Sequence, residues 1–351
     1  LLAPLPALAA PPPATVVVAF DRDTIRPLIV EGLANKESAR AVAANDPVRI
    51  ASISKLIMAL TAIRLMDEGK VDLERDVSDY LGWKLRSPYN PDDPITLLHL
   101  LMHRAGLSDR EGYIIPLGDS LEAKLADPAA WRKTGAPNWD SFEYANLGAP
   151  LVATALEAAS GERYDRLVER LVFAPLGIKA CLNWIGCDAE MQARAVTLYR
   201  DTGEVARDDP ADMPPNCAIP LAEGQACNIE AYKPGTNASI FSPQGGVRIG
   251  MLDLAKIGQV LLRMDGPDDF LSAKSQTLWF QTLITALHHL AHGDSGFCGY
   301  GVGVYVLAEA PPCRDDLFAD GGERAGHGGE AYGLRSGLWM SFRDSTGIAY
   351  F

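Results

Sequence analysis

Apolar residues near the start of the chain recur with the spacing of a buried helix. Between positions 53 and 63 they follow the pattern i, i+3, i+4, i+7 and i+10, and they are Ile53, Leu56, Ile57, Leu60 and Ile63. This period predicts a helix with one apolar stripe facing a core, and Gly69 marks the end of the helical region. Upstream, residues 14–20 predict a strand, and a second extended segment is expected before the helix.

Further periodic segments follow in the middle of the chain. Residues 95–106, 146–161 and 163–177 each combine a helical apolar period with a closing glycine or a nearby proline. Each of these three segments therefore predicts a helix.

The last third of the chain returns to a mixed pattern. Residues 252–264 and 275–291 predict helices, because their apolar positions keep the helical period. Residues 299–309, 333–342 and 346–351 predict strands, because they are rich in aromatic and β-branched residues.

These elements predict a sheet domain interrupted by a helical one. We expect residues 14–90 and 241–351 to form the sheet domain, with residues 91–240 inserted as the helical domain. Within the insertion, residues 178–240 predict a long irregular loop, because Pro, Gly and Asp are frequent there. Residues 1–13 form a proline-rich leader that resembles the end of a secretory signal peptide.

Composition and charge narrow the functional class. With 351 residues, 48% of them hydrophobic, the chain can bury a substantial core. Its net charge of −13 comes without a basic block, which argues against nucleic acid or an anionic membrane as the main partner. Prolines would break any membrane-spanning helix in the uncharged first twenty residues. The small residues at 7–9 resemble a signal-peptide cleavage site, so we expect export to the periplasm or secretion.

The six cysteines fall into three local pairs. The pairs are Cys181 with Cys187, Cys217 with Cys227, and Cys298 with Cys313. Such pairs predict three short disulfide loops in an oxidising compartment, with reduced, buried cysteines as the alternative. The absence of a CxxC sequence argues against a zinc ribbon or a thioredoxin-like site.

Ser52 and Lys55 stand three residues apart at the beginning of the first predicted helix. This spacing places both side chains on one helical face, where free backbone NH groups and the helix dipole favour negative charge. A serine hydroxyl needs an adjacent base to become a nucleophile, and a desolvated lysine with a lowered pKa can be that base. The alternative is a helix cap beside a lysine that extends to solvent.

Two further short motifs carry polar groups that suit catalysis. Tyr144 and Asn146 precede a predicted helix, so both can project from one turn. A phenol near an ammonium can have its pKa lowered enough to exchange protons, and an asparagine amide can hold a substrate carbonyl. His327 begins a glycine-flanked strand-like segment, where a ligand can approach closely.

Taken in order, the sequences SISK at 52–55, YAN at 144–146 and HGG at 327–329 resemble the serine β-lactamase and penicillin-binding-protein superfamily. The resemblance is greatest to the class C branch, which includes family VIII carboxylesterases and D-aminopeptidases. It extends over most of the chain, including residues 99–109 and 241–257. The resemblance implies an α+β fold, with an antiparallel sheet flanked by helices and an inserted helical domain.

The same resemblance assigns roles to the first two motifs. Ser52 would be the acylated nucleophile and Lys55 its base. Tyr144 would shuttle protons to the leaving group and from water, and Asn146 would bind substrate.

In the third motif, His327 and Gly329 would contact substrate, and the backbone NH groups of Ser52 and Glu330 would form the oxyanion hole. Typical class C β-lactamases have lysine where this chain has His327, and that lysine helps to bind the acidic group of the antibiotic. Histidine is only partly charged near neutral pH, and HxG variants occur among esterase and peptidase relatives. Neutral esters are therefore the favoured substrates.

We therefore expect an exported serine hydrolase that forms an acyl-enzyme at Ser52 and acts as a carboxylesterase on small or bulky esters. Its partner would be a small-molecule ester or amide, and no metal or cofactor is required. There are three alternatives: a β-lactamase, a D-amino-acid peptidase or DD-carboxypeptidase, and a penicillin-binding sensor or scaffold with little turnover.

The histidines at 288, 289 and 292 include an i, i+4 pair, but no third metal ligand accompanies them. The sequence leaves the oligomeric state open.

Overall fold

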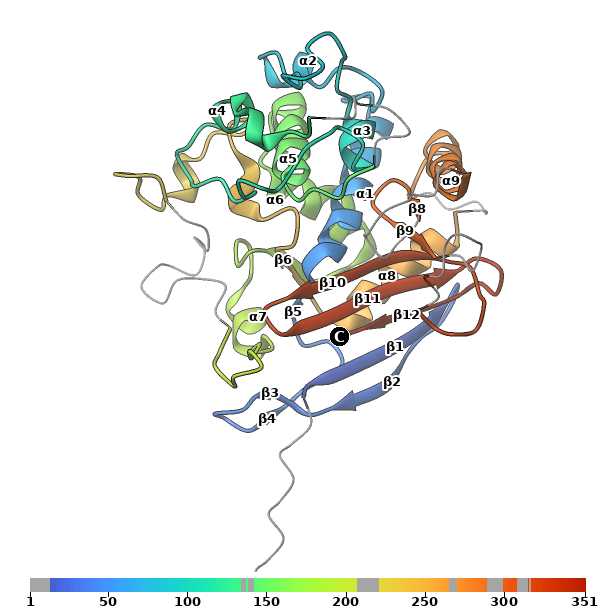
Figure 1. The fold of residues 1–351 in the computed structure, drawn as a ribbon. Helices are drawn as coiled ribbons and strands as arrows, with labels where there is room; N and C mark the ends of the chain where they lie inside the picture. Colours follow the sequence, from blue (N-terminus) through green and yellow to red (C-terminus); the bar gives the residue numbers. More distant parts are fainter. Residues whose placement is uncertain are drawn as a thin grey trace, which may run out of the picture.

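A computed structural model describes residues 13–133, 137, 142–206, 221–264, 270–288, 299–307, 315 and 317–351. Within these residues, seven strands form one antiparallel sheet (Figure 1). In spatial order the strands are β2 (Ile25–Glu31), β1 (Thr15–Asp21), β12 (Thr346–Tyr350), β11 (Leu334–Ser341), β10 (Arg324–Ala331), β9 (Tyr305–Leu307) and β8 (Gly299–Tyr300). The sheet confirms the expected α+β class, and within it β1 from the beginning of the chain pairs with β12 from the end.

The helix α8 (Met251–Leu262) packs on the sheet, and this packing explains the burial pattern of β1 and two of the glycines in the sheet domain. Alternate side chains of β1 are buried, so the expected strand is confirmed. Phe20 of β1 fits against Gly258 of α8 and Gly347 of β12, because a Cβ atom at either glycine would overlap its ring. These two glycines therefore let the helix and strand backbones approach closely.

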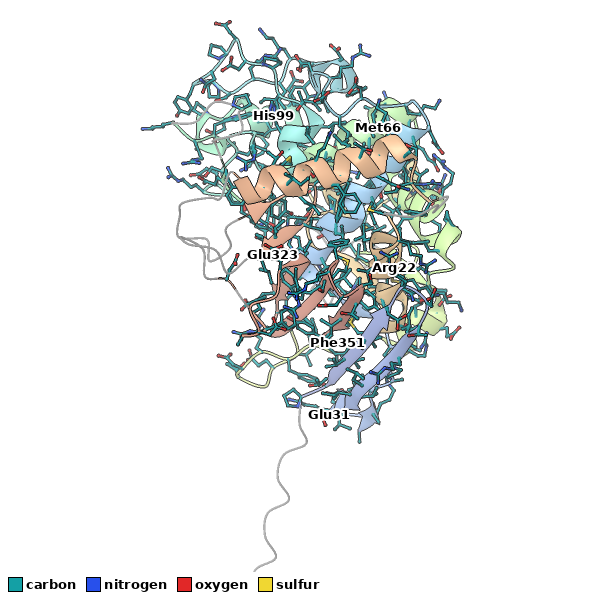
Figure 2. The ribbon with its side chains drawn as sticks, turned by 90° about the vertical axis from the view of Figure 1, so that its right-hand side faces the viewer. Arg22, Glu31, Met66, His99, Glu323 and Phe351 are labelled. Carbon is teal, nitrogen blue, oxygen red and sulfur yellow. A yellow bond between two sulfur atoms is a disulfide. The ribbon has the colours of Figure 1, made fainter. Side chains whose placement is uncertain are left out.

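The helix α1 (Ser54–Asp67) runs through the centre of the molecule (Figure 1). A 3-10 turn, η1 (Ala51–Ile53), leads directly into it, and Gly69 follows its end in a left-handed conformation, as expected. One buried stripe was expected, but every residue from 54 to 63 is buried. The single-stripe expectation is wrong because η1 packs on the sheet while helices contact α1 from the other sides. Among them, α9 (Ala273–His288) crosses in front of α1 in Figure 2.

The helical part of the fold lies on the far side of α1 from the sheet (Figure 1). Its elements are α2 (Ser78–Leu81), α3 (Leu97–Leu101), α4 (Leu121–Ala126), η2 (Pro128–Ala130), α5 (Gly148–Ser160), α6 (Tyr164–Val168), η3 (Glu169–Phe173) and η4 (Ala174–Leu176). The expected helix at 146–161 is confirmed by α5, and the one at 163–177 by the run from α6 to η4. The expected helix at 95–106 is too long, because left-handed backbone at His103 and Gly106 turns the chain soon after α3.

Short elements make up the remaining connections. Two small sheets contain β3 (Leu33–Asn35) with β4 (Arg40–Ala41), and β5 (Val48–Arg49) with β7 (Val247–Ile249) and β6 (Ala180–Leu182). The expected irregular loop contains β6, α7 (Ala189–Arg194), η5 (Ile229–Ala231) and η6 (Ala238–Phe241), and its residues 207–220 lie outside the described part.

The expected single strand at 299–309 is wrong. Residues 299–307 form a tight hairpin of β8 and β9, in which the Gly301 NH donates to the Val304 carbonyl at 2.9 Å. Gly303 has a φ of 72°, a left-handed conformation that glycine adopts without a steric penalty and that allows the reversal.

One expected disulfide lies fully within the described residues. Cys181 and Cys187 are bonded, with their Cα atoms 5.1 Å apart. Cys227 is also disulfide-bonded, whereas its expected partner Cys217 and the Cys298 and Cys313 pair lie outside the described residues. No helix in the described ranges has the length and apolar character needed to cross a membrane. The domain boundaries remain a prediction, and residues 1–12 of the expected leader are not among those described.

Candidate active site

Ser52 lies in η1, where the chain turns from β5 into α1. The preceding residue, Ala51, has a φ of 49°, in the left-handed region that alanine rarely adopts. Such local strain is found where the surrounding fold fixes a functional group. Here the strained residue Ala51 directly precedes Ser52, which lies at the wall of a pocket.

Lys55 sits one turn after Ser52 and is almost completely buried, with 1% of its surface exposed. Its Nζ donates to Ser52 Oγ at 3.1 Å, to Asn146 Oδ1 at 2.8 Å and to the Gln244 carbonyl at 3.0 Å. Burial lowers the pKa of Lys55 to about 7, although the Asp109 carboxylate opposes this shift. A lysine with this pKa is often neutral near pH 7, so it can accept a proton from the serine that it contacts.

Asp109 organises the second motif and was given no role by the sequence. Its carboxylate accepts hydrogen bonds from the backbone NH groups of Asn146 and Leu147, at 2.8 and 3.0 Å, and from Asn146 Nδ2 at 2.9 Å. The Asn146 amide therefore has its oxygen on Lys55 and one NH on Asp109. Its second amide proton remains for a substrate carbonyl. The acidic residue at the end of the 99–109 segment was the available sequence signal.

Tyr144 lies over the Lys55 ammonium, which is 4.7 Å from the centre of its ring. Its hydroxyl forms a hydrogen bond with Ser52. Burial raises the pKa of Tyr144, and this effect outweighs the hydrogen bond, which lowers the pKa. The expectation of a lowered phenol pKa is therefore wrong, and Tyr144 stays protonated at neutral pH.

The glycine-rich strand β10 passes directly beside η1. A Cβ atom on Gly329 would overlap the Ile50 carbonyl oxygen and the Ser336 hydroxyl, so only glycine allows this approach. Because β9 pairs only with residues 324–326, the edge of β10 from His327 onward has no strand neighbour on that side among the described residues. Glu330 lines the same pocket as Ser52, while their shared oxyanion hole remains a prediction.

His327 is placed behind the pocket wall, with 1% of its surface exposed. Its Nδ1 is 2.6 Å from the Gly328 carbonyl and its Nε2 is 3.1 Å from the Tyr300 hydroxyl. A carbonyl only accepts, so Nδ1 carries the proton and Nε2 accepts from Tyr300. Burial, reinforced by the Lys55 charge, lowers the pKa of His327 to about 3. The histidine is therefore neutral and is not among the residues that line the pocket beside Ser52, so its role as a substrate ligand stays a prediction.

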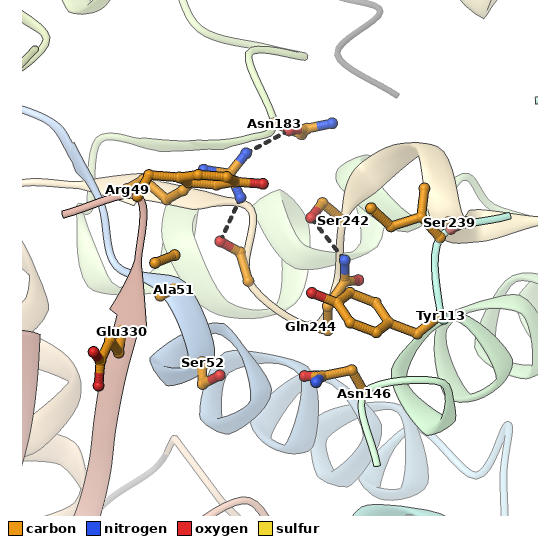
Figure 3. A pocket seen from close by; sticks show the side chains of 14 residues that line it. Arg49, Ala51, Ser52, Tyr113, Asn146, Asn183, Ser239, Ser242, Gln244 and Glu330 are labelled. Atoms are coloured by element: carbon orange, nitrogen blue, oxygen red, sulfur yellow. Dashed lines mark hydrogen bonds between the residues drawn. The ribbon is translucent and has the colours of Figure 1, made fainter. Parts of the chain in front are cut away.

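The pocket beside Ser52 has a volume of about 130 Å³. Its wall also includes Arg49, Tyr113, Asn183, Ser239, Gln244 and Tyr332. Figure 3 shows Arg49 held by hydrogen bonds from its guanidinium to Asn183 Oδ1 and to the Gly245 carbonyl, each 2.8 Å long. The sequence reasoning missed these wall residues, because they come from distant segments that share no local motif.

Metal ligands are not gathered in the part of the chain that the structure describes. No group of three or more His, Cys, Asp or Glu side chains there could hold an ion. The side chains of the histidines at 288, 289 and 292 lie outside that part.

Comparison with known proteins finds relatives that are similar in sequence to part of this chain. Esterase EstB from Burkholderia gladioli is 27% identical over 229 residues, which cover 60% of this chain and 56% of EstB. The D-alanyl-D-alanine-carboxypeptidase/endopeptidase AmpH from Escherichia coli (strain K12) is 32% identical over 140 residues, covering 38% of this chain and 35% of AmpH. The matches thus span about half of EstB and about a third of AmpH.

Solved structures show the same fold over nearly the whole chain. EstCE1, a hydrolase with promiscuous acyltransferase activity, superposes with a TM-score of 0.69 at 22% identity, covering 96% of this chain and 87% of EstCE1. A class C beta-lactamase from Rhodobacter sphaeroides gives a TM-score of 0.66 at 17% identity, covering 96% of this chain and 88% of that one. The Beta-lactamase family model matches residues 13–351. This chain therefore belongs to the Beta-lactamase family.

Proposed function

We propose that the protein is a carboxylesterase that forms an acyl-enzyme at Ser52. The observation that carries this proposal is the 3.1 Å contact between Ser52 Oγ and Lys55 Nζ. The buried lysine has a pKa of about 7, so it can serve as the general base at neutral pH. Small and bulky carboxylic esters are the proposed substrates.

In the acylation step, neutral Lys55 takes the proton of Ser52 as Oγ bonds to the ester carbonyl carbon. The carbonyl oxygen becomes an oxyanion, which the backbone NH groups of Ser52 and Glu330 would stabilise. The intermediate then loses the alkoxide leaving group, which takes a proton from the Tyr144 hydroxyl. Lys55 returns its proton to Tyr144, so both groups regain their starting states and the acyl group stays on Ser52.

Deacylation reverses the proton movements. The Tyr144 hydroxyl accepts a proton from the attacking water and passes its own proton to neutral Lys55, while the water oxygen bonds to the acyl carbonyl carbon. Ser52 Oγ then leaves and takes the proton back from Lys55. Because Tyr144 remains a neutral phenol at working pH, it acts as a relay between Lys55 and the reacting oxygen.

The preference for esters rests on the charge at the third motif. Where the related β-lactamases have lysine, this protein has His327, whose pKa of about 3 leaves it neutral. A site without that permanent cation loses one attraction for the acidic group of a β-lactam. The match to an esterase supports the same assignment.

We also propose that the protein acts in the periplasm or outside the cell. The Cys181–Cys187 disulfide supports this location, since disulfides persist in oxidising compartments.

A substrate panel tests the proposal directly. We expect kcat/KM for the best p-nitrophenyl ester to exceed that for nitrocefin by at least about 100-fold, a transition-state difference of about 2.7 kcal/mol. Intact-mass measurement should detect a transient acyl adduct that is absent from Ser52→Ala.

Nitrocefin turnover equal to that of the best ester would overturn the substrate assignment. D-alanyl peptides as the best substrates would instead favour the peptidase that the AmpH match suggests, and a lasting adduct without turnover would indicate a sensor.

A further inference from the structure

His103 lies in the segment that follows α3, and its ring packs against Tyr144 of the YAN turn. It has a φ of 54°, so its backbone is in the left-handed region, and only 7% of its surface is exposed. A buried histidine held in an uncommon backbone conformation requires compensating contacts from its surroundings. Here those contacts converge on Tyr144.

Two hydrogen bonds join His103 to the residues on either side of Tyr144. The Glu143 NH donates to the His103 carbonyl at 2.9 Å. The Ala145 NH donates to His103 Nδ1 at 3.2 Å. One residue therefore fixes the backbone immediately before and immediately after the candidate proton shuttle.

The imidazole also packs on the phenol ring itself. The ring centres of His103 and Tyr144 are 4.3 Å apart, and their planes are tilted by 34°. On its other side the imidazole meets Tyr300 edge-on at 4.8 Å. The Tyr144 ring is thus held both by the imidazole that packs on it and by the hydrogen bonds to its flanking backbone.

The protonation state of His103 suits this contact. Nδ1 can accept from Ala145 only when it carries no proton, so the neutral ring must have its proton on Nε2. Burial keeps the pKa of His103 well below its ordinary value, and the charge of Lys55 acts in the same direction. The acceptor is therefore present throughout the neutral pH range.

We propose that His103 is a positioning residue that holds the Tyr144 hydroxyl at Ser52. This inference rests on the proposed function, in which Tyr144 relays protons. Asp109 holds the following NH groups of the same turn, at Asn146 and Leu147, but makes no such contact with the two residues that flank Tyr144. Loss of the His103 contacts would leave the phenol free to move away from the reacting oxygen.

Two variants separate the ring of His103 from its acceptor. His103→Phe keeps an aromatic ring under Tyr144 but leaves the Ala145 NH without a partner. His103→Asn places an amide oxygen near the position of Nδ1, and asparagine tolerates the left-handed backbone. Since small displacements of a catalytic group cost up to about 100-fold, we expect the Phe variant to lose about 10- to 100-fold in ester kcat, with KM changed less than about threefold. The Asn variant should recover kcat to within about fivefold of wild type.

His99→Phe is a matched control, because His99 Nδ1 accepts the Thr96 NH at 3.3 Å in a helix cap away from the site. It should lose stability while keeping kcat. Thermal unfolding of every variant would confirm that the compared proteins are folded.

A double-mutant cycle with Tyr144→Phe distinguishes positioning from a general structural effect. If His103 acts through Tyr144, His103→Phe should reduce kcat little further once the phenol hydroxyl is absent. Wild-type kcat in His103→Phe, or an equal loss in both backgrounds, would overturn the inference. If Tyr144→Phe alone keeps full turnover, the proposed relay is wrong, and the inference is then judged by the crystal structure of His103→Phe. A Tyr144 hydroxyl still bonded to Ser52 in that structure would refute it.

Discussion

Lowering the pH from about 8 to about 6 should slow acylation of Ser52, because it protonates the base. The pKa of Lys55 is about 7. The neutral fraction of such a group falls from roughly 0.9 to roughly 0.1 over this interval. We therefore expect kcat/KM for an activated ester to fall about tenfold. A lysine with its ordinary pKa would be almost fully charged at both values, and its small neutral fraction would fall about 100-fold, so the size of the drop distinguishes the two cases.

The assay compares two measurements of the same step. Ester kcat/KM would be followed at a wavelength where the p-nitrophenol signal does not depend on pH. The rate of Ser52 labelling by a fluorophosphonate reports on nucleophile activation without deacylation. Both should show one acid limb with a midpoint near the pKa of Lys55, about 7.

Other groups near Ser52 do not produce a limb at this pH. Burial lowers the pKa of His103 and His327 and raises that of Tyr144, so all three keep one state there. Glu157 has a pKa raised to about 7, but its contacts are with Tyr232, Gly235 and the backbone of Tyr164. The limb should therefore persist in Glu157→Gln. A flat profile in both assays, or a limb lost in that variant, would refute Lys55 as the titrating base.

Three further predictions concern the nucleophile and the stability of the fold. Ser52→Ala should abolish fluorophosphonate labelling and reduce turnover by several orders of magnitude; labelling at another serine or a merely tenfold loss would contradict the assignment. Glu157 binds its proton more tightly in the folded than in the unfolded state, because burial raises its pKa from 4.5 to about 7. The free energy of unfolding should therefore fall by about 3 kcal/mol as pH rises through that interval, and urea titrations should show this slope disappearing in Glu157→Gln. Removing the Cys181–Cys187 bond with a double serine variant should cost about 2 kcal/mol in the chain-entropy model, so an unchanged urea midpoint would argue against a stabilising bond.

Local patterns in the sequence predicted the elements whose burial follows a simple period. β1 alternates between buried and half-buried residues, and α5 ends at Gly161, which adopts the left-handed cap expected of a terminal glycine. The contact between Ser52 and Lys55 was predictable for the same reason, because a separation of three on a helix brings two side chains to one face. The burial of every face of α1 was not, since it depends on elements from distant parts of the chain.

Side chains brought together by tertiary packing account for the features that the sequence did not reveal. Tyr300 reaches His327 from β8, and the tight hairpin that carries it was expected to be one strand. Asp109 reaches Asn146 across a separation of 37 residues. Neither partner is marked by a local period, so the expected positions of the motif residues were easier to derive than their environments.

Burial of several ionisable groups around Ser52 also explains why a histidine suits position 327. A low-dielectric setting disfavours charge, so it lowers the pKa of Lys55 and of both histidines and raises that of Tyr144. Lys55 is then the one member of this set that changes charge near neutral pH. The Lys55 charge already lowers the pKa of His327, and the repulsion between two cations acts equally on both. A lysine at position 327 that kept its charge would therefore lower the pKa of Lys55 further, whereas the neutral histidine leaves the base poised near pH 7.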